Sequence, residues 1–133
     1  MRDHIKTFHH YFFTLDPDEK VIQSNISAAL NLADESAKRA YDNLKEKGYF
    51  NNLIAANISQ EIAVDSISLD LNQYPYPFRC YATQQLIRAT STITRKLVTS
   101  GTLRNVSRSD NNPHGFLIQQ WVTLDNHDEP LKP

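Results

Sequence analysis

The stretch Tyr74–Val106, YPYPFRCYATQQLIRATSTITRKLVTSGTLRNV, decides the fold expected for this chain of 133 residues. It contains two long runs, about 78–89 and 94–106, that are rich in Tyr, Phe, Ile, Val and Thr. Such side chains fit the pleated, half-buried surface of a sheet. Only residues 90–93 separate the runs. Parallel strands would need a crossover of about a dozen residues or more, so the stretch predicts an antiparallel hairpin.

This hairpin is also the basic part of the chain. Residues 71–109 contain no Asp or Glu, whereas residues 1–70 carry a net charge of −4 and residues 110–133 a net charge of −3. Neighbouring side chains of a strand point to opposite faces, so we expect Arg79 and Arg95 on one face and Arg88 and Lys96 on the other. The six cationic side chains are Arg79, Arg88, Arg95, Lys96, Arg104 and Arg108.

The bulk composition predicts a single soluble domain over residues 1–133. The chain is 40% hydrophobic and 22% charged, which is typical of a globular protein. Cys80 is the only cysteine, which excludes an internal disulfide and a cysteine-based zinc site; its apolar neighbours predict burial. No apolar run approaches the roughly 18 residues of a membrane span, and the first residues do not resemble a signal peptide.

Three helical segments precede the hairpin, at about 3–15, 17–31 and 33–47. The first has an apolar stripe at helical spacing, formed by Ile5, Phe8, Phe12 and Leu15. Asp16 followed by Pro17 predicts the cap and first residue of the second helix. Gly48 suits the left-handed residue that ends the third helix, and residues 53–57 predict a short extra turn.

The first helix also carries His4, His9 and His10. Their separations of five and one residues do not give the i, i+4 spacing that puts two metal ligands on one helix face. We therefore expect exposed polar positions rather than a metal site.

Two further strands flank the hairpin, at about 58–71 and 116–124. In the first, the apolar positions change from even to odd numbers, which predicts a β-bulge near Asp65-Ser66. Gly101 is a plausible bend point of the long hairpin strand. In the last strand the even positions Phe116, Ile118, Val122 and Leu124 are expected in the core, with Leu117 and Trp121 on the opposite face. Residues after Leu124 are expected to fray.

Helices first and strands afterwards predict an α+β fold, with three N-terminal helices packed on one face of a curved antiparallel sheet of about four strands. This arrangement is similar to the cone of the nuclear transport factor 2-like fold.

No catalytic set is evident. The only glycines, at positions 48, 101 and 115, form no phosphate-binding loop, and no serine elbow or metalloprotease His-Glu pair is present. Asp65 or Asp70 could act as a base only inside an apolar cone, but the neighbouring serines indicate a solvated face. We expect no enzyme, no cofactor and no metal.

Several runs, FHHYFFTLDPDEKVI, NISAALNLAD, KGYFNNLIAANI, YPYPFRCYATQQLIR and RNVSRSDNNPHGF, closely resemble the periplasmic part of the TraK family of conjugative-transposon transfer proteins. That family in turn looks like component 8 of VirB-type type IV secretion systems. The resemblance spans about Ile5 to Asn126. Its most specific mark is Asn112-Pro113-His114-Gly115, which matches the Asn-Pro-any-Gly motif of the component 8 family.

The resemblance implies the periplasmic domain of a bacterial inner-membrane protein, whose cytoplasmic tail and membrane helix are missing from this sequence. It implies a non-catalytic scaffold of the DNA-transfer channel, which contacts itself and other channel components. Surplus aromatic and turn residues are the candidate contacts: Phe8, Tyr11, Phe12, Asn112, Pro113, Gly115 and Trp121.

Two alternatives remain open at this point. The basic hairpin 78–108 could touch single-stranded DNA, because aromatic side chains beside basic ones stack bases and pair phosphates. A small-molecule enzyme on the same fold is the more remote alternative.

Overall fold

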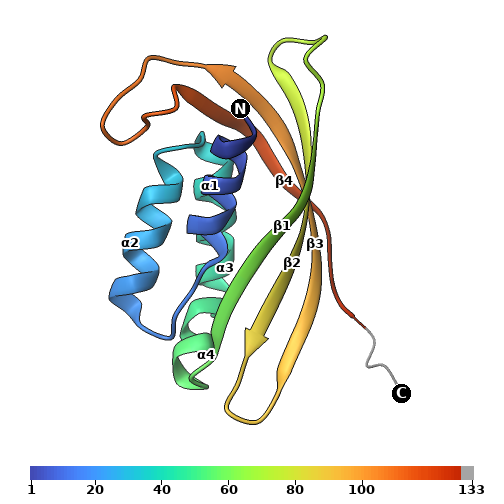
Figure 1. The fold of residues 1–133 in the computed structure, drawn as a ribbon. Coiled ribbons are helices and arrows are strands. Elements are labelled where there is room, and N and C mark those ends of the chain that lie inside the picture. Colours follow the sequence, from blue (N-terminus) through green and yellow to red (C-terminus); the bar gives the residue numbers. More distant parts are fainter. Residues whose placement is uncertain (130–133) are drawn as a thin grey trace.

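The computed structural model describes residues 1–129 and has a helical layer on one face of a four-stranded antiparallel sheet (Figure 1). The strands are long and curved, and they follow one another in the order β1-β2-β3-β4. The expected α+β class, with a curved nuclear transport factor 2-like sheet, is therefore confirmed.

The helical layer consists of α1 (Arg2–Phe13), α2 (Glu19–Leu30), α3 (Glu35–Glu46) and α4 (Tyr49–Ala55). The cap expected for the second helix is wrong by two residues, because the Asp18 carboxylate, not that of Asp16, accepts a hydrogen bond from the Lys20 N–H at 2.9 Å. The segment before it forms a turn instead, in which the Asp18 N–H donates to the Asp16 carbonyl at 2.8 Å. Gly48 has φ +77° and connects α3 to α4, which confirms the expected left-handed residue.

The sheet consists of β1 (Ser59–Leu69), β2 (Tyr76–Ile87), β3 (Thr92–Asn105) and β4 (Phe116–Asp128). The predicted hairpin is confirmed as β2 and β3, which close with Ile87 opposite Thr92. The predicted bulge in β1 is also confirmed, since the register shifts between Val64 and Ser66. The expectation that residues after Leu124 fray is wrong up to Asp128, because β4 continues to pair with β3; residues 130–133 lie outside the described chain.

The faces of β4 differ from the predicted pattern. Trp121 is 3% exposed, whereas Val122 and Leu124 are each 50% exposed, so the expected outward Trp121 and inward Val122 and Leu124 are wrong. The reason is a bulge: Gln120 has φ +52°, and the register with β3 shifts between Ser100 and Thr102. One additional residue on β4 exchanges the faces of Val122 and Thr123, and a second register shift, between Val98 and Thr99, exchanges them again beyond Leu124.

Gly101 lies on β3 inside this shifted register. A Cβ at that position would approach the Gln119 carbonyl oxygen to 3.0 Å and the Phe78 ring to 3.1 Å. Gly101 therefore permits the close approach of β4, in addition to any bend of its own strand.

An aromatic cluster joins α1 to the sheet and forms the centre of the core. The Trp121 ring lies 4.9 Å from that of Phe8 and 4.8 Å from that of Phe12, both in edge-to-face arrangements. Such pairs add to the burial of apolar surface. Cys80 is buried beside this core, as expected, and burial raises the pKa of its thiol to about 12.

His9 belongs to the same core, so its expected exposure is wrong. Its ring is fully buried. Its Nδ1 lies 2.7 Å from the Ile5 carbonyl oxygen, which can only accept, so Nδ1 carries the proton and donates. Nε2 then accepts from the Thr99 hydroxyl on β3 at 2.6 Å. Burial lowers the pKa of His9 to about 4, and the imidazole is therefore neutral near pH 7.

Candidate functional site

The Asn112–Gly115 motif forms a tight turn between β3 and β4. Ser109 and Asn112 exchange backbone hydrogen bonds of 3.1 Å, and Asn112 Nδ2 donates to the Phe116 carbonyl at 2.6 Å. Gly115 has φ +74°, and a Cβ there would lie 2.9 Å from Arg108 Cγ, so a side chain at this position would be strained. Asn112 and Gly115 are buried parts of the turn, while Pro113 is exposed at its tip.

The turn docks on α1 through two histidines. His4 is buried, which corrects its expected exposure, and its Nε2 lies 3.0 Å from the Leu32 carbonyl oxygen. Burial lowers the pKa of His4 to about 4 and keeps the ring neutral. Nε2 must then donate to Leu32, so Nδ1 is free to accept from Nδ1–H of His114, 3.3 Å away. The motif is thus attached to the helical layer by one imidazole pair.

A groove of about 290 Å³ lies where the turn meets α1 and α2. Tyr11 and Pro113, two of the residues singled out in the sequence, meet there although they come from opposite ends of the chain. The rim carries mainly amide and hydroxyl groups, with one carboxylate. This surface suits recognition of another protein chain. The lining residues are Thr7, Tyr11, Ala28, Asn31, Leu32, Asp110, Asn111, Pro113 and His114.

Three other candidates do not reach this surface. Phe8 and Phe12 are 0% and 2% exposed, and Trp121 packs between them in the core. As the chain is folded, these rings stabilise the domain and offer no contact face. The surplus of aromatic residues on the first helix is therefore explained by packing against the sheet.

The expected division of the basic side chains between two faces is confirmed, but its membership is wrong. The hairpin register pairs Gln84 with Arg95 and Thr83 with Lys96. Even positions of β2 therefore share a face with odd positions of β3, so Arg79 lies with Lys96 on the uncovered face and Arg95 on the helix-covered face. A sequence pattern within each strand could not give this register.

Acidic partners offset the positive charge of two of these cations. Arg95 Nε lies 2.6 Å from Asp128 Oδ1, and Lys96 Nζ lies 3.3 Å from Glu129 Oε1. Arg104 is exposed on β3, Arg88 lies in the turn after β2, and Arg108 lies against Gly115. The six positive side chains therefore form no single basic track.

His4 and His114 are the site residues that sequence reasoning missed. A signal was present for His4, because it precedes Phe8 by four residues and so lies on the buried stripe of the helix. Within residues 1–129, no group of three or more His, Cys, Asp or Glu is arranged to hold a metal ion. None of the helices in the same range is long and apolar enough to cross a membrane.

No protein-family model matches the chain, and no curated protein matches its sequence. Solved structures do match it in fold. The soluble domain of TrwG type IV secretion machinery from Bartonella grahamii has a TM-score of 0.73 at 18% identity, covering 99% of this chain and 95% of that one. The VirB8 protein of Agrobacterium tumefaciens gives 0.72 at 8% identity, covering 99% and 92%.

A periplasmic fragment of TraM gives a TM-score of 0.68 at 15% identity, covering 97% of this chain and 98% of that one. These identities are low, so the similarity concerns the fold, but it extends over nearly the whole length of every chain compared. The chain thus has the fold of the VirB8-like domains of type IV secretion systems.

Proposed function

We propose that this chain is the periplasmic domain of an inner-membrane scaffold protein in a conjugative type IV secretion system, of the TraK type. The observation that carries the proposal is the shared fold over at least 92% of each chain with TrwG and VirB8. The resemblance of the Asn112–Gly115 motif and the surrounding runs supports the same assignment. In the complete protein, a membrane helix and a short cytoplasmic tail would precede residue 1.

The role is protein contact rather than chemistry. The groove between α1, α2 and the Asn112–Gly115 turn is the proposed contact surface, because it gathers an aromatic ring, an exposed proline and amide groups at one place. Such mixed apolar and polar surfaces are typical of non-obligate interfaces. Self-association and contacts with other channel components would both use surfaces of this kind.

The proposal is tested by deleting the gene in its host and restoring the full-length gene or variants of it. Deletion should abolish DNA transfer, and the wild-type gene should restore it. Asn31→Arg, which places a long charged side chain in the groove, should lower transfer by about tenfold or more, as expected for a central interface position. Ser24→Arg is the matched control, because Ser24 is exposed on α2 outside the groove and its variant should transfer normally.

Unchanged transfer after deletion would refute the scaffold role. Normal transfer with Asn31→Arg would remove the groove from the proposal and leave the role itself. Fractionation of the restored cells checks the inner-membrane location.

A further inference from the structure

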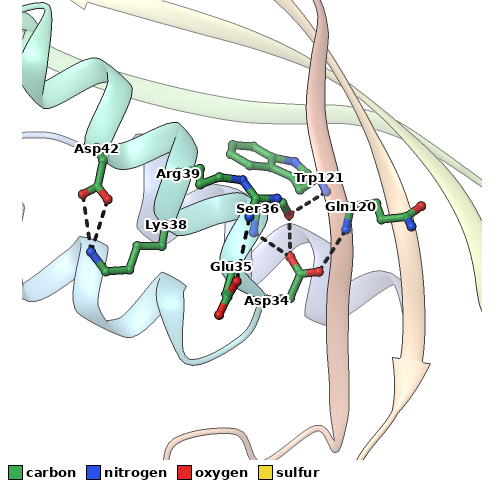
Figure 2. Close-up of polar contacts among 8 residues, drawn as sticks. All are labelled: Asp34, Glu35, Ser36, Lys38, Arg39, Asp42, Gln120 and Trp121. Atoms are coloured by element: carbon green, nitrogen blue, oxygen red, sulfur yellow. Dashed lines mark hydrogen bonds and ion pairs between the residues drawn. The ribbon is translucent and has the colours of Figure 1, made fainter.

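Within residues 1–129, the outer edge of β4 is covered only in its first half. The Ile118 N–H donates to the Leu32 carbonyl at 3.0 Å, and the Asp34 N–H donates back to the Ile118 carbonyl at 2.7 Å. Figure 2 shows how Gln120 and Trp121 are held. The Asp34 carboxylate accepts from the Gln120 N–H at 3.2 Å, and the Ser36 hydroxyl accepts from the Trp121 N–H at 2.8 Å. This cover stops at Trp121.

From Val122 to Glu129 every residue is exposed, and among the described strands β4 pairs with β3 alone. Exposed edges are usually blunted by charged side chains, above all lysine, by proline, by a bulge or by a very short strand. Residues 122–128 contain neither lysine nor proline. Their carboxylates are turned to partners within the sheet, Asp128 to Arg95 and Asp125 to His127 at 2.9 Å. The register shift between Val98 and Thr99 places a bulge at Leu124, and the edge keeps peptide groups available for pairing on both sides of it.

A cavity of about 330 Å³ opens beside this free edge. On the strand side it is bounded by Trp121, Thr123 and Asn126, and on the α3 side by Asn43 and Lys47. Among the residues that the structure describes, Lys47 is the only charged one in the lining, and Trp121 Nε1 is buried without a hydrogen-bond partner. The inner walls are mostly apolar: Phe12, Phe13, Leu15, Ala40, Leu44, Tyr49, Phe50, Gln84 and Leu97.

We propose that residues 122–128 of β4 accept an extended segment of another protein as a fifth strand. One side chain of that segment, aromatic or large aliphatic, enters the cavity. An acidic side chain two residues away pairs with Lys47. The added strand continues the cover that Leu32–Ser36 provides for the first half of the edge, and it shields Val122 and Leu124, which are half exposed.

Strand geometry supports this occupant. Side chains of an added strand point to the same faces as the β4 residues opposite them, so on each side of the bulge at Leu124 alternate positions face the cavity. Two positions on one face are roughly 7 Å apart, a span that separates an apolar wall from a charge at its rim. Main-chain pairing supplies affinity and the pocket supplies specificity in this mode of recognition. A small molecule would fill the cavity but leave the peptide groups of the edge unpaired.

The inference deepens the proposed function. It rests on that function in one respect, namely that the partner is another component of the channel. Binding is measured with the purified chain, so the result is independent of the DNA-transfer assay. The probes are the synthetic peptides TVTFTETVT and TVTLTETVT, whose Phe or Leu and Glu lie on one face when extended. Binding is followed by the emission of Trp121, the only tryptophan, and by amide hydrogen exchange.

We expect a saturable change in emission and slower exchange at residues 122–128 on addition of either peptide. Lys47→Glu should weaken binding by about tenfold or more, since it opposes the peptide carboxylate. Lys45→Glu is the matched control on the same helix, because Lys45 is exposed and outside the cavity, and it should leave binding within about twofold.

Four outcomes would overturn the inference: no binding at millimolar peptide, equal binding of a peptide of the same composition without alternation, equal effects of the two lysine variants, or protection of residues other than 122–128. Protection of 122–128 that grows with protein concentration in the absence of peptide would assign the edge to a second copy of the chain instead.

Discussion

Single residues show how burial changes the chemistry of one side-chain type. His9 and His10 are neighbours on α1, yet His9 is fully buried between the Ile5 carbonyl and the Thr99 hydroxyl, and His10 is exposed. Protonation of His9 would place a charge in the core and would cost the hydrogen bond that its Nε2 accepts. The fold is therefore linked to pH through this position.

The sign of the linkage follows from the direction of the pKa shift. The folded-state pKa of His9 is about 4, below the ordinary value of 6.5. Between these values the unfolded chain binds a proton that the folded chain does not, so stability is complete above about pH 6.5 and falls towards pH 4. A shift of this size corresponds to a loss of as much as about 3 kcal/mol.

We therefore expect the free energy of unfolding, measured in urea, to fall between pH 7 and pH 4. His9→Gln should lower stability at pH 7 but flatten this pH dependence, since one of the two buried imidazoles is gone. His10→Gln should keep the wild-type pH dependence. An equally steep dependence in His9→Gln would contradict the assignment.

At the scale of elements, the start of α3 determines which side chains of β4 enter the core. Asp34 caps α3 through the Ser36 N–H at 2.9 Å, and the same two side chains bind the backbone of Gln120 and Trp121 (Figure 2). The two N–H groups that the bulge turns away from β3 thus find acceptors in the helix cap. Buried backbone groups need such partners. The consequence is that Trp121, and not Val122, enters the core.

Ser36→Ala should therefore be costly. It leaves the buried N–H of Trp121 without an acceptor, with an expected loss of about 1–3 kcal/mol in the free energy of unfolding. Glu35→Ala is the control from the same turn, because Glu35 forms an exposed pair with Arg39 at 3.9 Å, and it should change stability by less than about 0.5 kcal/mol. Urea unfolding monitored by Trp121 emission measures both. Equal losses would mean that the contact does not hold the bulge.

At the scale of the whole molecule, the helices cover one face of the sheet and leave the other open (Figure 1). This arrangement separates Arg95 from Arg79 and Lys96, and the cation pairs with Asp128 and Glu129 lower the remaining positive potential. A continuous groove of positive charge with aromatic rings, which binding of single strands requires, is not formed by residues 1–129.

We expect single-stranded DNA to bind no more tightly than about 0.1 mM near physiological salt, the weak end of nonspecific binding. Fluorescence anisotropy with a labelled oligonucleotide measures this. Tighter binding, with a slope of about −4 in a plot of log affinity against log salt concentration, would indicate that all six basic side chains contact phosphates. The hairpin would then be a DNA-binding surface.

The sequence by itself determined features that depend on a few neighbouring residues. The β-favouring residue types of 78–89 and 94–106, with their short connection, specified the hairpin. The change of parity near Asp65 specified the bulge, and Gly48 specified the end of α3. Each follows from local geometry, because side chains of a strand repeat every two residues and only glycine enters the left-handed region without strain. The order of helices before strands was enough for the fold class.

Only the tertiary structure decided which side chains meet. Ser36 and Trp121 are 85 positions apart, His9 and Thr99 are 90, and His4 and His114 are 110. No periodicity reaches across such separations, and each of the two additional residues in β4 reverses the faces of the residues that follow it. Burial of the aromatic cluster and satisfaction of backbone groups outweigh the simple alternation of the strand, which is why Trp121 lies inside and the free edge begins at Val122.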